Sequence, residues 1–118
     1  MYLIVTRSFP PELGGMQSLM WGLAREMSKN FMIKVFADFK DGHKDFDEQA
    51  NFSIERVGGI KFLRKIRKSQ LIDEFTKENK VKGIIADHWK SLEPLKSKNK
   101  KYCLIHGKEI NHPKGSGL

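Results

Sequence analysis

Short apolar runs recur along the chain, and each is followed by glycine or by a polar residue. Runs of about five residues that are rich in branched or aromatic side chains predict β-strands. Because these runs are almost continuously apolar rather than alternating, we expect both faces of each strand to be covered, as in a parallel sheet. The expected strands lie at residues 2–6, 31–39, 52–57, 83–86 and 101–105.

The segments between these runs have the three- and four-residue spacing of amphipathic helices. Residues 16–30 predict one helix, and residues 60–79 predict a longer one, whose periodicity slips near Ser69 and leaves a break into two helices open. A short helix is expected at 91–98, and the polar, mostly acidic residues 38–49 are expected to form a loop. Strands that alternate with helices predict an α/β fold, a Rossmann-like doubly wound and mostly parallel sheet.

In an open parallel sheet, ligands bind beyond the carboxyl ends of the strands. Three segments that carry glycine or polar residues follow predicted strands directly, namely 7–17, 87–89 and 106–111. The candidate chemistry of the chain is therefore expected in these three segments.

The first segment contains Gly14 and Gly15 immediately before the predicted helix. A helix N-terminus presents unpaired N–H groups and a positive dipole end, and glycine lets a ligand approach the backbone closely, so the pair indicates phosphate binding. The pair also fits a tight turn without a ligand. The segment matches neither the Walker A pattern nor the Gly-x-Gly-x-x-Gly pattern of dinucleotide-binding proteins.

The other two segments each carry a histidine. His106 stands directly after the last predicted strand and before Gly107, where it either donates a hydrogen bond or proton in the crevice or caps the strand. His88 and Trp89 follow the fourth strand. Trp89 is a candidate platform for a sugar ring, but a half-buried packing tryptophan is the commoner case.

The chain has 118 residues, which suits one domain, and a net charge of +8. Such a charge favours an anionic partner, although it also serves solubility. Five cations within eight residues predict either a solvated helix face or contact with an anionic acceptor or membrane surface. An alternative function is therefore a non-catalytic basic α/β module that binds an anionic surface or nucleic acid, although no nucleic-acid motif is present. The five cations are Lys61, Arg64, Lys65, Arg67 and Lys68.

The N-terminal residues lack the charged region and long apolar stretch of a signal peptide, and no apolar run reaches the roughly 18 residues of a membrane span. Cys103 is the single cysteine, so the chain cannot form an internal disulfide. These features favour a cytoplasmic protein, either soluble or peripheral at the inner face of the membrane. The histidines and Cys103 have no zinc-ligand spacing, and no metal is expected.

Several of these features occur together in a known family. The phrase His106-Gly107-x-Glu109 after a late strand resembles one of its motifs, and the beginning of the chain resembles another. Both motifs occur in the family's order, and the similarity spans nearly the whole chain. The first motif comprises Leu3-Ile4-Val5-Thr6, Phe9-Pro10-Pro11, Gly14-Gly15 and Leu23-Ala24, and resembles the start of family 4 glycosyltransferases.

The resemblance implies the N-terminal, acceptor-side domain of a GT-B enzyme. Such an enzyme transfers a sugar from a nucleotide-diphosphate donor, with retention, to an acceptor that is a glycan or lipid-linked, and it needs no metal or other cofactor. Gly14 and Gly15 would lie near the donor's distal phosphate, and His106 would contact the transferred sugar. Gln17 matches a position that faces the acceptor in some members. Further acceptor-side candidates are His88, Trp89 and Glu109.

The family's C-terminal donor domain, with its Lys/Arg pair and two spaced glutamates, has no counterpart in residues 1–118, nor do the last strands of the N-terminal domain. We therefore expect an incomplete GT-B N-terminal domain: a fragment, a truncated gene product or half of a split enzyme, inactive alone. A single flavodoxin- or receiver-like domain is another alternative, but Arg7 stands where a receiver needs an acidic cluster.

Overall fold

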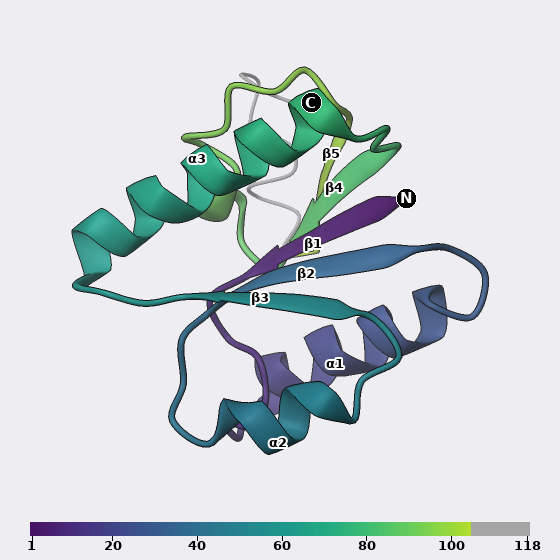
Figure 1. Cartoon of the computed structure of the whole chain (residues 1–118), viewed down its shortest axis with the longest axis vertical. Helices are drawn as coiled ribbons and strands as arrows, with labels where there is room; N and C mark the ends of the chain where they lie inside the picture. Colours follow the sequence, from purple (N-terminus) through teal and green to yellow (C-terminus); the bar gives the residue numbers. More distant parts are fainter. Residues whose placement is uncertain (105–118) are drawn as a thin grey trace.

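A five-stranded, entirely parallel sheet forms the centre of the protein in the computed structural model, which describes residues 1–104 (Figure 1). The strands lie in the order β3-β2-β1-β4-β5. The chain therefore builds outward from β1 on one side and then crosses to the other side at β4, which is the doubly wound arrangement that the sequence predicts. The strands are β1 (Tyr2–Thr6), β2 (Ile33–Asp38), β3 (Ser53–Val57), β4 (Gly83–Ala86) and β5 (Lys101–Cys103).

Helices cover both faces of the sheet. Figure 1 shows α1 and α2 on one face and α3 on the other. Because α3 connects β3 to β4, it carries the chain across the sheet at the switch in strand order. This arrangement confirms the predicted Rossmann-like α/β fold. The helices are α1 (Gly15–Met27), α2 (His43–Glu48) and α3 (Lys61–Glu78), and a short 3₁₀ helix, η1 (Trp89–Ser91), follows β4.

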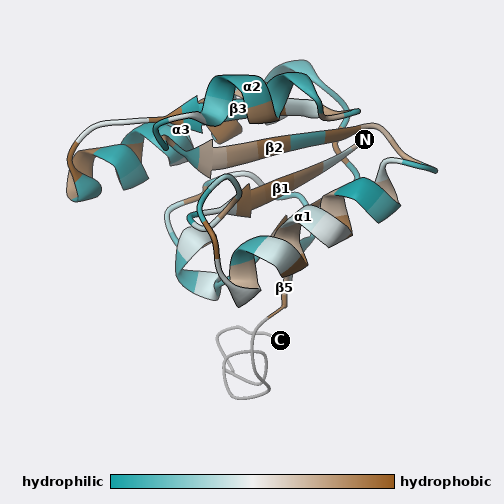
Figure 2. Ribbon diagram, turned by 90° about the horizontal axis from the view of Figure 1, so that it is seen from below, coloured by the Kyte–Doolittle hydropathy of each residue, from teal (hydrophilic) through white to brown (hydrophobic). Residues whose placement is uncertain are grey.

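The central strand β1 contributes to a separate core on each face. Ile4 packs with the α1 and α2 side, whereas Leu3 and Val5 pack with the α3 side. All three side chains are at most 1% exposed. Each such side chain contributes roughly 1.5–3 kcal/mol through burial, so the continuous apolar run has a direct energetic cause. Figure 2 shows β1 and β2 coloured hydrophobic over most of their length, whereas α2 is mostly hydrophilic.

The prediction of a loop over residues 38–49 is wrong in its second half, where α2 forms. Phe46 is the single large apolar residue of α2, and its ring packs 4.8 Å from Trp21 and 6.2 Å from Phe9 between centroids. The Phe46 ring, together with the ion pair between Asp47 and Arg56 of β3, holds this polar helix of six residues against the sheet face. These are tertiary contacts, which leave no periodic pattern in the sequence.

Two expectations about helices in residues 60–98 are also corrected. α3 runs without a break through Ser69, whose hydroxyl donates to the Ile66 carbonyl oxygen at 2.8 Å within the helix. The short helix expected at 91–98 does not form, because η1 ends at Ser91 and turns follow it. Leu92 and Leu95 nevertheless pack into the α3-side core.

Candidate functional site

The carboxyl ends of β1 and β4 are joined by a buried hydrogen-bond network. The Thr6 hydroxyl donates to Asp87 Oδ2 at 2.7 Å, and the Arg7 backbone N–H donates to the same oxygen at 3.3 Å. Asp87 is 3% exposed, and its other carboxylate oxygen has no hydrogen-bond partner within residues 1–104. This network fixes the chain where it leaves β1, at the switch in strand order.

A second network, which we call the Asp38 cluster, attaches α3 to the same edge of the sheet. It consists of Asp38 at the end of β2 and two α3 side chains, Lys68 and Arg64. Lys68 Nζ donates to Asp38 Oδ1 at 2.5 Å and to the Thr6 carbonyl oxygen at 3.2 Å. Arg64 Nε lies 3.1 Å from Asp38 Oδ2. Both carboxylate oxygens of Asp38 are therefore engaged with cations.

Burial affects the pKa of Lys68. Desolvation lowers the pKa of Lys68, and the hydrogen bond and charge of Asp38 oppose that effect. The Lys68 side chain is 6% exposed and the Asp38 side chain 12%. Taking the Lys68 ammonium group out of water is costly, and the paired Asp38 carboxylate offsets part of that cost.

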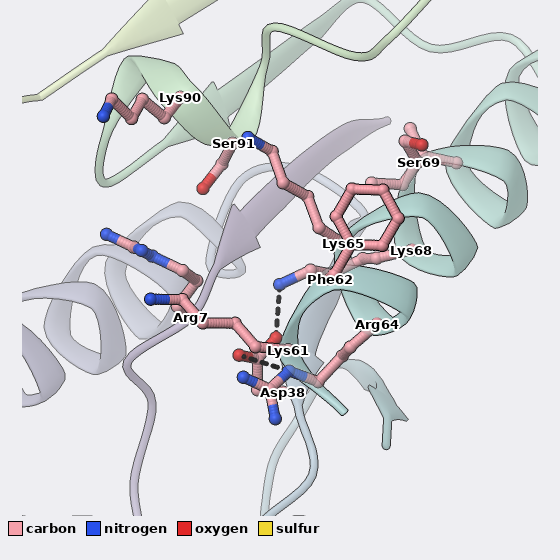
Figure 3. A pocket seen from close by; sticks show the side chains of 11 residues that line it. Arg7, Asp38, Lys61, Phe62, Arg64, Lys65, Lys68, Ser69, Lys90 and Ser91 are labelled. Carbon is pink, nitrogen blue, oxygen red and sulfur yellow. Dashed lines mark hydrogen bonds and ion pairs between the residues drawn. The ribbon is translucent and has the colours of Figure 1, made fainter. Parts of the chain in front are cut away.

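Next to the Asp38 cluster lies a cavity of about 410 Å³, which we call the basic pocket (Figure 3). Among residues 1–104, Asp38 is its single acidic lining residue, and Phe62 and Ile72 supply apolar walls. Hydroxyl groups come from Ser69 and Ser91. A concave site with several cations and few acids concentrates positive potential and attracts anions. The cationic lining residues are Arg7, Lys61, Arg64, Lys65, Lys68 and Lys90.

The cations of the basic pocket differ in how they are neutralised. Asp38 pairs with Lys68 and Arg64. Lys65 lies 3.9 Å from Glu93, with both side chains nearly half exposed, a geometry that adds little stability. The side chains of the other three lining cations form no ion pair or hydrogen bond within the described part of the chain. These three are Arg7, Lys61 and Lys90.

The glycine pair lies where the sequence predicts it, at the N-terminus of α1. Gly14 precedes the helix without any side-chain cap, and a Cβ there would stand 2.2 Å from the Gln17 side-chain oxygen. Gln17 therefore folds back over Gly14, while nothing lies within 4 Å of a Cβ placed at Gly15. None of these three residues lines the basic pocket.

Arg56 braces the loop that carries this glycine pair. Its guanidinium contacts both oxygens of Asp47, at 3.1 and 2.7 Å, and donates to the carbonyl oxygen of Pro10. It also lies 5.6 Å from the centre of the Phe9 ring. With the Arg56 side chain 4% exposed, these contacts fix the loop against β3 and α2 without a ligand.

The structure places the two residues predicted after β4 outside the basic pocket. His88 Nδ1 accepts a hydrogen bond from the Lys90 backbone N–H at 3.2 Å, so His88 caps η1. Trp89 is half-buried, and its neighbours Lys90 and Ser91 line the pocket instead. His106 and Glu109 lie outside the described residues.

Sequence reasoning missed the residues that organise the pocket. Asp38 lies where the predicted strand 31–39 and the predicted loop 38–49 overlap, and Lys68 is one of the five clustered helix cations although it is 4% exposed. One signal was present: Lys68 precedes Ile72 by four residues and Phe75 by seven, the spacing of the buried face of α3. Four of the five helix cations, Lys61, Arg64, Lys65 and Lys68, have the spacing of one helix face and line the pocket, whereas Arg67 does not.

Comparisons with protein-family models, curated proteins and solved structures found no significant match to this chain. The resemblance to glycosyltransferases therefore stays a prediction from the motifs. Within residues 1–104, no three His, Cys, Asp or Glu side chains are grouped so that they could hold a metal ion. No helix in that part of the chain combines the length and the apolar character needed to cross a bilayer.

Replacing Lys68 with methionine tests the Asp38 cluster, because it keeps a long apolar side chain and leaves Asp38 with Arg64 alone. We expect the free energy of unfolding, measured with urea, to fall by about 2–4 kcal/mol. Lys65→Met is the matched control, since Lys65 lies on the same helix with a side chain 47% exposed. It should change stability by about 0.5 kcal/mol or less. Equal losses in the two variants would show that the cluster does not hold α3 to the sheet.

Proposed function

We propose that this chain is the acceptor-side Rossmann-like domain of a retaining GT-B glycosyltransferase. The observation that carries the proposal is the location of the basic pocket, at the carboxyl edge of a parallel sheet and beside the loop with the family-like motif. Transfer from a nucleotide-diphosphate donor needs a positive environment near the leaving phosphates, which the α1 N-terminus would supply, and a crevice for the acceptor, which the basic pocket would supply. The fixed Phe9-Pro10 loop and the uncapped α1 N-terminus are compatible with that need.

In the proposed enzyme the chemistry is divided between two domains. The N–H groups that follow Gly14 and Gly15 would face the donor's distal phosphate, and His106 would donate a hydrogen bond to the transferred sugar. A second Rossmann-like domain would hold most of the nucleotide. We therefore expect the 118-residue chain alone to show no turnover of sugar nucleotides.

The His106→Ala variant tests the proposed catalytic role in an enzyme completed with its donor domain. Retaining transfer passes through an oxocarbenium-like state, which a fixed hydrogen-bond donor stabilises more than it stabilises the bound substrate. The turnover number should fall by roughly 10²-fold or more, while nucleotide affinity changes little.

His112→Ala is the matched control for that variant, and it should turn over normally. The melting temperature is measured on the same preparations. If the His106→Ala enzyme melts earlier but turns over at the normal rate, His106 acts in stability rather than in transfer.

A second candidate function is contact with an anionic membrane, and the beginning of α3 favours it. Ile60, Phe62 and Leu63 are 69%, 70% and 50% exposed, and Lys61 and Arg67 are exposed beside them. Apolar side chains flanked by cations suit the interface of a bilayer that contains anionic lipids. Such contact would also suit the transferase if its acceptor is a lipid.

Co-sedimentation with liposomes tests the membrane contact. We expect binding to vesicles that contain phosphatidylserine, weaker binding to phosphatidylcholine alone, and loss of binding in high salt. A Phe62→Ser/Leu63→Ser variant should lose most of the binding, whereas Leu19→Ser should keep it, because Leu19 is 52% exposed on α1 instead. Binding that does not depend on lipid charge or on salt concentration would exclude an electrostatic contact through these cations.

A further inference from the structure

The basic pocket carries more positive charge than the described residues neutralise. Asp38, its single acid, already bonds Lys68 and Arg64 through its two oxygens. Glu93 does not line the pocket, and its ion pair with Lys65 is long, at 3.9 Å, and solvent-exposed. The unpaired cations of the pocket therefore repel one another, and a bound anion would relieve this repulsion.

The backbone segments that carry these cations are held in place before any ligand binds. α3 is attached by the Asp38 cluster, and the Arg7 backbone is attached to Asp87. In Figure 3, Lys61 extends from α3 toward Arg7, which stands on the loop after β1. The same view shows Lys65 extending toward Ser91. Cations from separate elements thus converge on one space, which distinguishes the pocket from a solvated helix face.

The lining also selects among anions. An arginine presents a planar fork that bonds two phosphate oxygens at once, and lysines add mobile point charges. The hydroxyl of Ser91 is a further donor, whereas Phe62, which is 70% exposed, offers apolar surface. A volume of about 410 Å³ lies in the range of small-molecule sites and exceeds what a bare phosphate fills.

We propose that the basic pocket binds a phosphate monoester carried on an organic group, with the dianion between Arg7, Lys61 and Lys65 and the organic part against Phe62. The Gly14-Gly15 loop does not line this pocket, so the bound phosphate is distinct from the donor's diphosphate. Within the proposed transferase, on which this reading rests, the phosphate belongs to the acceptor. The phosphate is borne either by a soluble sugar or polyol phosphate or by a membrane lipid.

Titration of the ¹⁵N-labelled chain with three compounds tests the pocket and distinguishes the sources. The compounds are inorganic phosphate, glycerol 3-phosphate and dihexanoyl phosphatidic acid. We expect amide shifts at residues 61–65 and at Arg7, with both esters binding more tightly than inorganic phosphate. A phosphatidic acid that binds at least ten times more tightly than glycerol 3-phosphate assigns the site to a lipid, and equal affinities assign it to a soluble ester.

An Arg7→Gln/Lys61→Gln variant should weaken ester binding at least tenfold and leave the melting temperature unchanged, because neither side chain has a partner within the described residues. Arg25→Gln/Lys77→Gln removes the same charge from exposed positions away from the pocket and should weaken binding less than twofold. Equal weakening by the two variants would overturn the pocket, since only net charge would then matter. Absence of shifts with all three compounds would overturn it as well.

The outcome for the pocket is separable from the outcome for the transferase. Ester binding without sugar transfer in the completed enzyme would keep the pocket and refute the transferase. Sugar transfer to an acceptor without phosphate, unaffected by Arg7→Gln/Lys61→Gln, would keep the transferase and refute the pocket as its acceptor site.

Discussion

The carboxylate of Asp38, shared between Lys68 and Arg64, is the interaction on which the carboxyl edge of this protein depends. α3 is the crossover between the two halves of the sheet, and several of its first residues are exposed apolar or cationic side chains with few contacts to the core. The Asp38 cluster holds this half of the helix against β1 and β2. Without it, Ile72 and Phe75 would still anchor the second half, but the wall of the basic pocket would lose its support.

The opposite face is organised by aromatic packing and by a second buried ion pair, between Arg56 and Asp47. Phe9, Trp21 and Phe46 form an aromatic cluster, and Arg56 connects that cluster to Asp47 and to the loop after β1. β1 is common to both faces, and its carboxyl end is fixed by Thr6 and Asp87. Two different surfaces therefore meet at one edge: a glycine loop beside α1 and a basic pocket beside α3. This division is why the proposed transferase would bind its donor and acceptor phosphates in separate places.

Periodicity predicts the strands and the long helices of this chain because burial on both sheet faces requires uninterrupted apolar runs. α2 escapes such prediction because one residue, Phe46, supplies its packing. The position of the glycine loop can be predicted from the local sequence, and the loop lies where expected. The pocket cannot be predicted in this way, because Asp38 and Lys68 are 30 residues apart and only the sheet order brings them together. Lys68 also shows how a charged residue on an apolar helix face marks a buried partner elsewhere in the chain.

The protonation of Lys68 tests this account most directly, and NMR of the ¹³Cε-labelled lysines measures it as a function of pH. The account predicts that Lys68 titrates below the exposed lysines, because desolvation lowers its pKa. In Asp38→Asn its pKa should fall further, because the carboxylate that opposes desolvation is gone. A Lys68 that titrates with the exposed lysines and does not respond to Asp38→Asn would contradict the buried cluster and the pocket built on it.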